Sequence, residues 1–229
     1  MKLPISDRLL ACAGFVHKGD RVADIGCDHG YLSIHLLTQG IARSCIASDV
    51  NEAPLQSAMR NGRKFGVANK MEFCLSDGVR NIPQDFDTMV CAGMGGDTMI
   101  HILESAPWLK GSRYRLILQC QSKTPMLRRY LSDQGWYIGK ETVLRDGKFL
   151  YTVMEVTYAP AYPRLTVGEA YFPPALLADP SPEVPVYFRY IREGLRIATA
   201  HQDNPEKKAA LAELEAMAHT PTLSFLTEE

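Results

Sequence analysis

Residues 21–32 read RVADIGCDHGYL and decide the fold that the sequence predicts. The run VADI is typical of a buried strand, and Gly26 and Gly30 mark a turn before an apolar segment of helical character. A strand, a glycine-bearing turn and a helix in this order begin a parallel α/β unit, which binds its ligand at the turn. Asp24 and Asp28 add two carboxylates there. The ligand must therefore tolerate negative charge.

Strand-like and helix-like segments alternate from this unit to about residue 135. We expect strands at 21–26, 44–50, 71–77, 86–94 and 114–120. We expect helices at 31–40, 52–66, 96–106 and 124–135, the last capped by Thr124. Two further strand-like runs within 136–158 flank Asp146-Gly147, a turn signal for an antiparallel hairpin. The pattern predicts a Rossmann-like α/β fold, a mostly parallel sheet that ends in an antiparallel hairpin.

The chain changes character after about residue 160. Residues 159–181 are rich in proline and alanine and are predicted to be a linker with a short helical piece. Apolar residues then recur at helical spacing over about 182–219, and Pro205 is placed to open a second helix. We therefore expect an α/β domain at 1–160 and a small helical domain at 161–229, built on an antiparallel helical hairpin.

The composition predicts a cytoplasmic protein. Of 229 residues, 46% are apolar and 22% charged, and the net charge is −1. No run approaches the roughly 20 apolar residues that a membrane span needs, and the N-terminus lacks the apolar stretch of a signal peptide. The six cysteines form no CxxC pair and no Cys/His cluster, which predicts buried thiols and no metal site. Any nucleic acid must be bound by local basic patches.

Acidic residues and glycines gather where the predicted parallel strands end. These loops are 24–30, 49–51, 76–78, 92–96 and 121–123. Because the carboxyl ends of parallel strands meet at one edge of a sheet, we expect them to form one site. Asp49 follows Gly30 by 19 residues, a suitable distance for a carboxylate that holds ribose hydroxyls. Asp77 is placed to accept a hydrogen bond from an adenine amino group.

The acidic turn favours S-adenosylmethionine over a dinucleotide. The dinucleotide fingerprint GxGxxG is absent, and Asp28 stands where a pyrophosphate would approach. S-adenosylmethionine has no phosphate, and its cationic methionine end suits Asp24 and Asp28. The predicted cofactor-binding residues are Asp24, Gly26, Cys27, Asp28, Gly30, Asp49, Val50, Asp77, Gly78, Ala92, Gly93 and Met94.

Five segments in order resemble one enzyme family. They are LLACAGFVHKGDRVADIGCDHGYL, ASDVNEAPLQSA, LSDG, CAGMGG and LQCQSK. Together they resemble the bacterial tRNA adenine-N1-methyltransferases that act on adenosine 22, the TrmK family of class I methyltransferases. In the general class I motif, Asp/Glu-x-Gly-x-Gly-x-Gly, the middle glycine is here Asp28. The resemblance covers roughly residues 1–160. It implies a Rossmann-like catalytic domain, a coiled-coil-like helical C-terminal domain, S-adenosylmethionine as donor and tRNA as substrate.

The catalytic residues are less clearly marked. Adenine N1 has an in-plane lone pair, so it can attack a methyl group without a strong base, and alignment and electrostatic support should dominate catalysis. The target base must be extruded to be reached, which calls for an aromatic face. Tyr31 is a candidate for that face, although burial beneath the helix would also explain it. Asp28 and Asp7 are further catalytic candidates, Asp7 because it precedes the first helix.

Contacts to tRNA are expected from basic residues and from the loop after the fourth strand. The candidates are Arg8, His29, Gly95, Gly96, Lys123, Arg128, Arg189, Arg192 and Arg196. The base-holding motif of many methyltransferases, Asp/Asn-Pro-Pro-Tyr/Phe, is absent from residues 92–96. Two alternatives stay open: a class I methyltransferase for another RNA or a small molecule, and a non-catalytic protein that binds S-adenosylmethionine.

Overall fold

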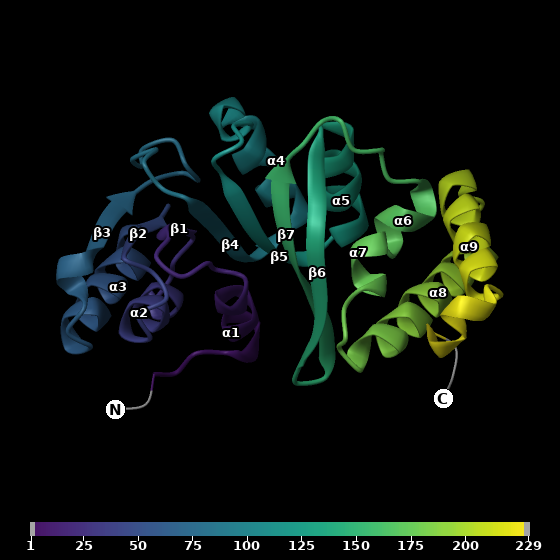
Figure 1. The fold of residues 1–229 in the computed structure, drawn as a ribbon, viewed down its shortest axis with the longest axis horizontal. Coiled ribbons are helices and arrows are strands. Elements are labelled where there is room, and N and C mark those ends of the chain that lie inside the picture. Colours follow the sequence, from purple (N-terminus) through teal and green to yellow (C-terminus); the bar gives the residue numbers. More distant parts are fainter. Residues whose placement is uncertain (1–2, 227–229) are drawn as a thin grey trace.

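The computed structural model describes residues 3–226 and contains one seven-stranded sheet (Figure 1). Its strands are β1 (Arg21–Ile25), β2 (Ser44–Asp49), β3 (Met71–Leu75), β4 (Thr88–Gly95), β5 (Arg115–Ser122), β6 (Trp136–Asp146) and β7 (Phe149–Tyr158). They lie in the order β3-β2-β1-β4-β5-β7-β6, and β1 to β5 are parallel. β7 is antiparallel to β5 and to β6. The predicted sheet and its closing hairpin are confirmed.

Helices cover both faces of this sheet. One face carries α1 (Asp7–Gly14), α2 (Tyr31–Thr38) and α3 (Glu52–Lys64), and the other carries α4 (Gly96–Glu104) and α5 (Thr124–Asp133). Alternate strand residues point to opposite faces, so Val22 packs under the first group of helices and Ala23 under the second. Short 3₁₀ turns occupy Ala68–Lys70, Pro107–Leu109 and Pro221–Leu226.

Two predicted helix starts are wrong by a residue or two. Ser6, whose side chain accepts from the Leu9 amide, caps α1, so Asp7 lies in the first turn of the helix and not before it. Lys123, not Thr124, is the N-cap of α5, and its φ of 60° turns the chain sharply out of β5. Capping by a side chain was expected at Thr124, but backbone geometry alone starts this helix.

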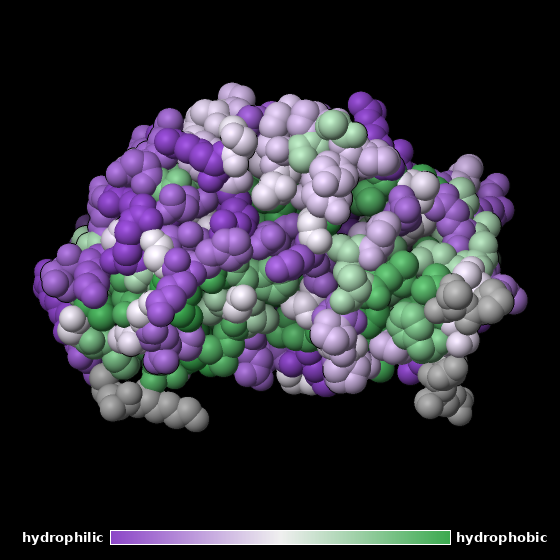
Figure 2. All heavy atoms as spheres, in the orientation of Figure 1, coloured by the Kyte–Doolittle hydropathy of each residue, from purple (hydrophilic) through white to green (hydrophobic). Residues whose placement is uncertain are grey.

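The tail forms four helices that pack together and against the sheet. They are α6 (Val167–Tyr171), α7 (Pro174–Leu177), α8 (Glu183–His201) and α9 (Pro205–Ala218), with Pro205 at the predicted place. Phe172, Phe188 and Leu214 are fully buried in a third apolar cluster, to which β6 contributes Val143. In Figure 2 hydrophobic residues gather along the lower half of the face shown, including the part over these tail helices. No helix within residues 3–226 is long and apolar enough to cross a bilayer.

Arg128 fastens the tail to the sheet. Its Nη2 lies 2.6 Å from Glu141 Oε1 on β6, and both side chains have no exposed surface. Its Nη1 donates to the backbone carbonyls of Ala170 (3.0 Å) and Tyr171 (2.9 Å). The prediction that Arg128 contacts tRNA phosphate is therefore wrong, because its guanidinium is buried and paired inside the protein.

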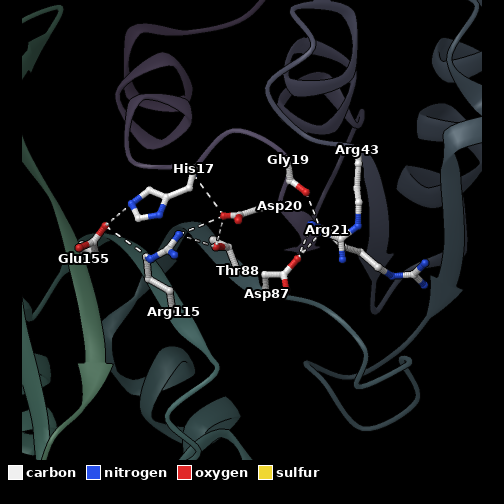
Figure 3. Close-up of polar contacts among 9 residues, drawn as sticks. All are labelled: His17, Gly19, Asp20, Arg21, Arg43, Asp87, Thr88, Arg115 and Glu155. Atoms are coloured by element: carbon white, nitrogen blue, oxygen red, sulfur yellow. Dashed lines mark hydrogen bonds and ion pairs between the residues drawn. The ribbon is translucent and has the colours of Figure 1, made fainter.

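A second polar network links β1, β4 and β5 at the edge of the sheet where these parallel strands begin (Figure 3). Asp20 accepts hydrogen bonds from Thr88 Oγ1 (2.6 Å) at the start of β4 and from Arg115 Nη1 (3.0 Å) at the start of β5. Asp87 accepts from the Arg21 amide at the start of β1 (2.8 Å) and pairs with Arg43 (2.7 Å). These charges hold the strand starts in register, away from the edge where ligands bind.

Candidate active site

A pocket of about 290 Å³ opens at the carboxyl edge of the sheet, beside β1 and β4. The strand order reverses here, with β2 and β3 on one side of β1 and β4 and β5 on the other. Such switch points leave a crevice for a ligand. Ten predicted site residues line it: Arg8, Asp24, Gly26, Cys27, Asp28, His29, Tyr31, Ala92, Gly93 and Met94. The remaining walls are Ser6, Leu9, Leu32, Gln119 and Gln121.

The turn after β1 has left-handed backbone at three alternate positions. The φ angles are 72° at Gly26, 49° at Asp28 and 71° at Gly30. Asp28 therefore keeps the conformation that a glycine would favour, and aspartate is among the side chains that tolerate it. A side chain at Gly30 would also meet Ala58 Cβ at 2.9 Å. Aspartate in place of the middle glycine of the class I motif therefore adds charge to the loop, while the backbone stays left-handed at this position.

Asp28→Gly is expected to keep the free energy of unfolding within about 1 kcal/mol of the wild-type value, because glycine fits this backbone but loses more chain entropy on folding. Asp28→Val is expected to lower it by about 1–2 kcal/mol, because a β-branched residue is strained there. The Asp28 side chain is 69% exposed, so lost burial does not confuse the comparison. Urea unfolding of both variants tests this. Equal stability of the two would contradict a strained position.

Asp24 is a buried carboxyl in the floor of the pocket. Only 4% of the residue is exposed, and Ser33 Oγ donates to its Oδ2 over 2.8 Å. Burial raises the pKa of Asp24 to about 6, and the hydrogen bond from Ser33 partly opposes this rise. At neutral pH the group is ionised and offers a cationic ligand a partner in a poorly solvated place.

This pKa links the stability of the protein to pH. Because the folded state holds the Asp24 proton more tightly, the carboxyl stabilises the fold fully below about pH 4, and this contribution is lost as the pH rises through about 6. Asp24→Asn should remove about 3 kcal/mol of that pH dependence, at 1.4 kcal/mol per pKa unit. Denaturant unfolding of both proteins from about pH 4 to pH 8 measures the difference. Parallel curves would contradict the assignment.

Asp49 organises two loops at once. Its Oδ2 accepts from the Asp28 amide (3.2 Å) and its Oδ1 from the Asn51 amide (2.9 Å), while the residue is only 8% exposed. The neighbouring Val50 is 60% exposed. Asp77, one strand further out, pairs with Arg80 at 3.0 Å and remains half-exposed. Asp49 and Asp77 follow β2 and β3 and do not line the pocket itself, so their roles toward ribose and adenine stay predictions.

The end of β4 forms the opposite wall. Its pairing with β5 shifts register between Ala92 and Met94, so Gly93 is an extra residue, with a φ of 81°. The fully buried Gln119 accepts from the Gly93 amide through Oε1 at 3.0 Å. The methyl group of Met94 lies over Gly26, where a Cβ would approach it to 2.3 Å. The β4 part of this wall is therefore backbone and one flexible thioether, with Gln119 of β5 beside it.

Helix α1 covers the pocket on its third side. Arg8 Nε lies 2.7 Å from Asp146 Oδ2 in the β6–β7 hairpin, and its guanidinium lies 5.2 Å from the centre of the Tyr151 ring. The rings of His29 and Tyr31 lie 5.4 Å apart at the rim. Asp7 is exposed and does not line the pocket. Tyr31 is half-buried among these groups, and its stacking role stays a prediction.

The other predicted tRNA residues do not meet in this pocket. Lys123 pairs with the exposed Asp97 at 2.6 Å, and Arg196 pairs with Glu215 at 2.6 Å. Arg192 lies over the Phe188 ring at 5.6 Å, and Arg189 sits on the same helix. Gly95 ends β4, and Gly96 begins α4 with no room for a side chain beside the Lys123 carbonyl. Their roles toward tRNA stay predictions.

The cysteine thiols at and near the pocket are not nucleophiles at neutral pH. Burial raises the pKa of the Cys91 thiol to about 12 and raises that of Cys27 further, so neither is a nucleophile at neutral pH. No group of three His, Cys, Asp or Glu side chains among the described residues is arranged to hold a metal ion. What the pocket offers is carboxylates, amides and bare backbone.

Comparisons with known proteins agree with this geometry. Residues 5–154 match the family described as Methyltransferase domain. A tRNA (adenine(22)-N(1))-methyltransferase of Bacillus subtilis is 30% identical over 154 residues, 67% of this chain. The chain spans 65% of that relative's length.

Solved structures extend the likeness over the tail. Streptococcus pneumoniae Sp1610, a candidate tRNA (m1A22) methyltransferase solved with S-adenosyl-L-methionine, is 31% identical, with a TM-score of 0.80 over 92% of this chain and 99% of that one. The Bacillus subtilis m1A22 tRNA methyltransferase TrmK, 24% identical, shares the fold with a TM-score of 0.77 over 99% of this chain and 98% of that one. The chain therefore belongs to the methyltransferase domain family and, within it, to the TrmK family that its motifs resemble.

Proposed function

We propose that this protein transfers the methyl group of S-adenosylmethionine to N1 of adenosine 22 in tRNA. The observation that carries the proposal is the acidic pocket at the switch point, with its glycine-bearing turn and with Asp24 buried in its floor. The relatives named for this reaction support the choice of substrate. The alternatives, another acceptor or binding without catalysis, find no separate support.

The residues present fit the donor. Asp24 suits its cationic methionine end, and the bare backbone at Gly26 and Gly93 allows close approach. In this proposal Asp49 holds the ribose hydroxyls and Asp77 accepts from the adenine amino group, with Val50 as an apolar contact beside them. When bound, the donor supplies a methyl group on a positively charged sulfur.

The chain's part in the reaction is alignment. The N1 lone pair of the target adenine forms the new bond to the methyl carbon as the carbon–sulfur pair returns to sulfur, and the adenine becomes a cation. No proton has to leave first, so no general base is needed. Asp24 and Asp28 favour the positive charge that passes through the pocket, and Tyr31 offers an aromatic face to the extruded base.

In this proposal the helical tail binds tRNA. Residues between 172 and 226 form most of the third apolar cluster, and α8 carries Arg189, Arg192 and Arg196. Because the proposed substrate is tRNA, we propose that the protein works in the cytoplasm. The division at about residue 160 is part of this proposal.

The test is to incubate unmodified tRNA transcript with the protein and S-adenosylmethionine, digest it, and analyse the nucleosides by mass spectrometry. We expect 1-methyladenosine, and none when adenosine 22 is replaced by guanosine. Calorimetry measures donor binding in parallel. Donor binding without any 1-methyladenosine would favour a non-catalytic protein or another acceptor.

A further inference from the structure

Gln119 is a polar side chain with no exposed surface in the wall of the pocket. Its amide oxygen accepts from the Gly93 amide at 3.0 Å, and its amide nitrogen donates to the Cys120 carbonyl at 3.2 Å. Burying an amide in a β-sheet is unfavourable unless such bonds are made. From the neighbouring strand β5, the Gln119 side chain therefore stabilises the bulge at Gly93.

This bond sets the direction of the peptide between Ala92 and Gly93. The peptide is trans, so its carbonyl points opposite to its N–H. Because β4 lies between β1 and β5, an N–H turned toward Gln119 on β5 leaves the Ala92 carbonyl on the side of β1. The nearest amides there, those of Gly26 and Cys27, both donate to Ser48 at 2.9 Å. They do not take up the Ala92 carbonyl.

The direction of this peptide matters for the chemistry of adenine. Residues 92–96 are Ala, Gly, Met, Gly and Gly, so the loop offers hydrogen bonds only through its backbone. A carbonyl can accept from the exocyclic amino group of adenine and leaves the N1 lone pair free. An N–H in the same place would donate to N1 and occupy the electrons that must attack the methyl carbon.

We propose that Gln119 is a positioning residue for methyl transfer, which turns the Gly93 N–H away from the target base and presents the Ala92 carbonyl to its amino group. This inference rests on the proposed function, since it concerns an adenine attacked at N1. The loop has no side chain that could hold the target base, and in this proposal the backbone of the β4 bulge holds it instead.

The first test is Gln119→Met, which keeps the length of the side chain and removes both hydrogen bonds. It is made only on a tRNA transcript that the wild-type protein methylates, so failure of the proposed function is seen first and separately. We expect kcat to fall about 100-fold, as a misplaced reactant does, while the donor Kd weakens by much less than kcat falls. An unchanged kcat, or a donor Kd that weakens as much as kcat falls, overturns the inference.

The second test, Gln119→Glu, decides the matter even if the methionine variant does not fold. A protonated glutamic acid accepts from Gly93 and donates to Cys120 as the amide does, whereas the carboxylate cannot donate. Burial favours the protonated form. We therefore expect kcat relative to wild type to recover as the pH falls from about 9 to about 6, across the range expected for a buried glutamic acid. A ratio that does not change with pH overturns the inference.

Discussion

Replacing Asp49 with alanine is expected to weaken the binding of S-adenosylmethionine about 100-fold or more, since hydrogen bonds to a charged group contribute about 1.5–3 kcal/mol each. The carboxylate holds the Asp28 and Asn51 amides. Its loss releases both loops and removes the proposed ribose contact. Isothermal titration of the donor into the variant measures the effect.

The matched control is Asp203→Ala. Asp203 is an exposed carboxylate in the turn between α8 and α9, paired only with Lys208 at 2.6 Å, so the donor Kd should not change. If Asp49→Ala bound the donor as tightly as this control does, the ribose assignment would be wrong.

The second large effect concerns the buried ion pair. Arg128→Met is expected to lower the free energy of unfolding by about 3–5 kcal/mol, because it leaves the Glu141 carboxyl buried without its partner. Arg128 Nη2 and Glu141 Oε1 lie 2.6 Å apart with no exposed surface on either side chain. Equilibrium unfolding in urea gives the difference directly.

The double variant Arg128→Met with Glu141→Leu separates the stability lost to the unpaired charge from the stability lost with the other hydrogen bonds of Arg128. Two apolar residues in place of a buried pair are often tolerated, so we expect about half of the lost stability to return. The remainder reflects the Ala170 and Tyr171 carbonyls, which lose their donor. If the double variant were as unstable as the single one, the uncompensated charge would not be the cause.

Periodicity and turn residues predicted the sheet and the loops that meet at its edge. Strand–helix alternation placed β1 to β5 within a few residues, because buried parallel strands read as apolar runs. Asp24, Gly26 and Gly93 were found for the same reason, since topology alone brings strand ends together. The tail helix starting at Pro205 also followed from its local signal.

What the sequence did not predict depends on tertiary contacts. Arg128 and Arg129 are adjacent in the same helix, yet only Arg128 points inward, beside Leu127 and Leu131. Its partner Glu141 faces inward because of a register shift after Ile138. The position of Arg128 between Leu127 and Leu131 in the sequence could have indicated that it is buried. Its partner Glu141 could be identified only from the pairing register of β6 and β7.

Gln119 was missed for a related reason. It lies near the end of the strand-like run RLILQC, where a single amide looks like a break in the strand and not like a contact to another loop. Gln121 was noticed as part of a strand end but had no assigned partner. Ser6 and Leu9 line the pocket because α1 folds over it, a long-range contact that local patterns do not encode.

The left-handed backbone at Asp28 has a consequence for how such enzymes change over generations. Codons for glycine and aspartate differ by a single nucleotide, and this turn accepts either residue without being rebuilt. A carboxylate can therefore enter or leave the donor pocket in one mutational step. A sequence pattern written as glycines alone excludes this chain, whereas one written as a left-handed conformation, with aspartate and asparagine admitted, includes it.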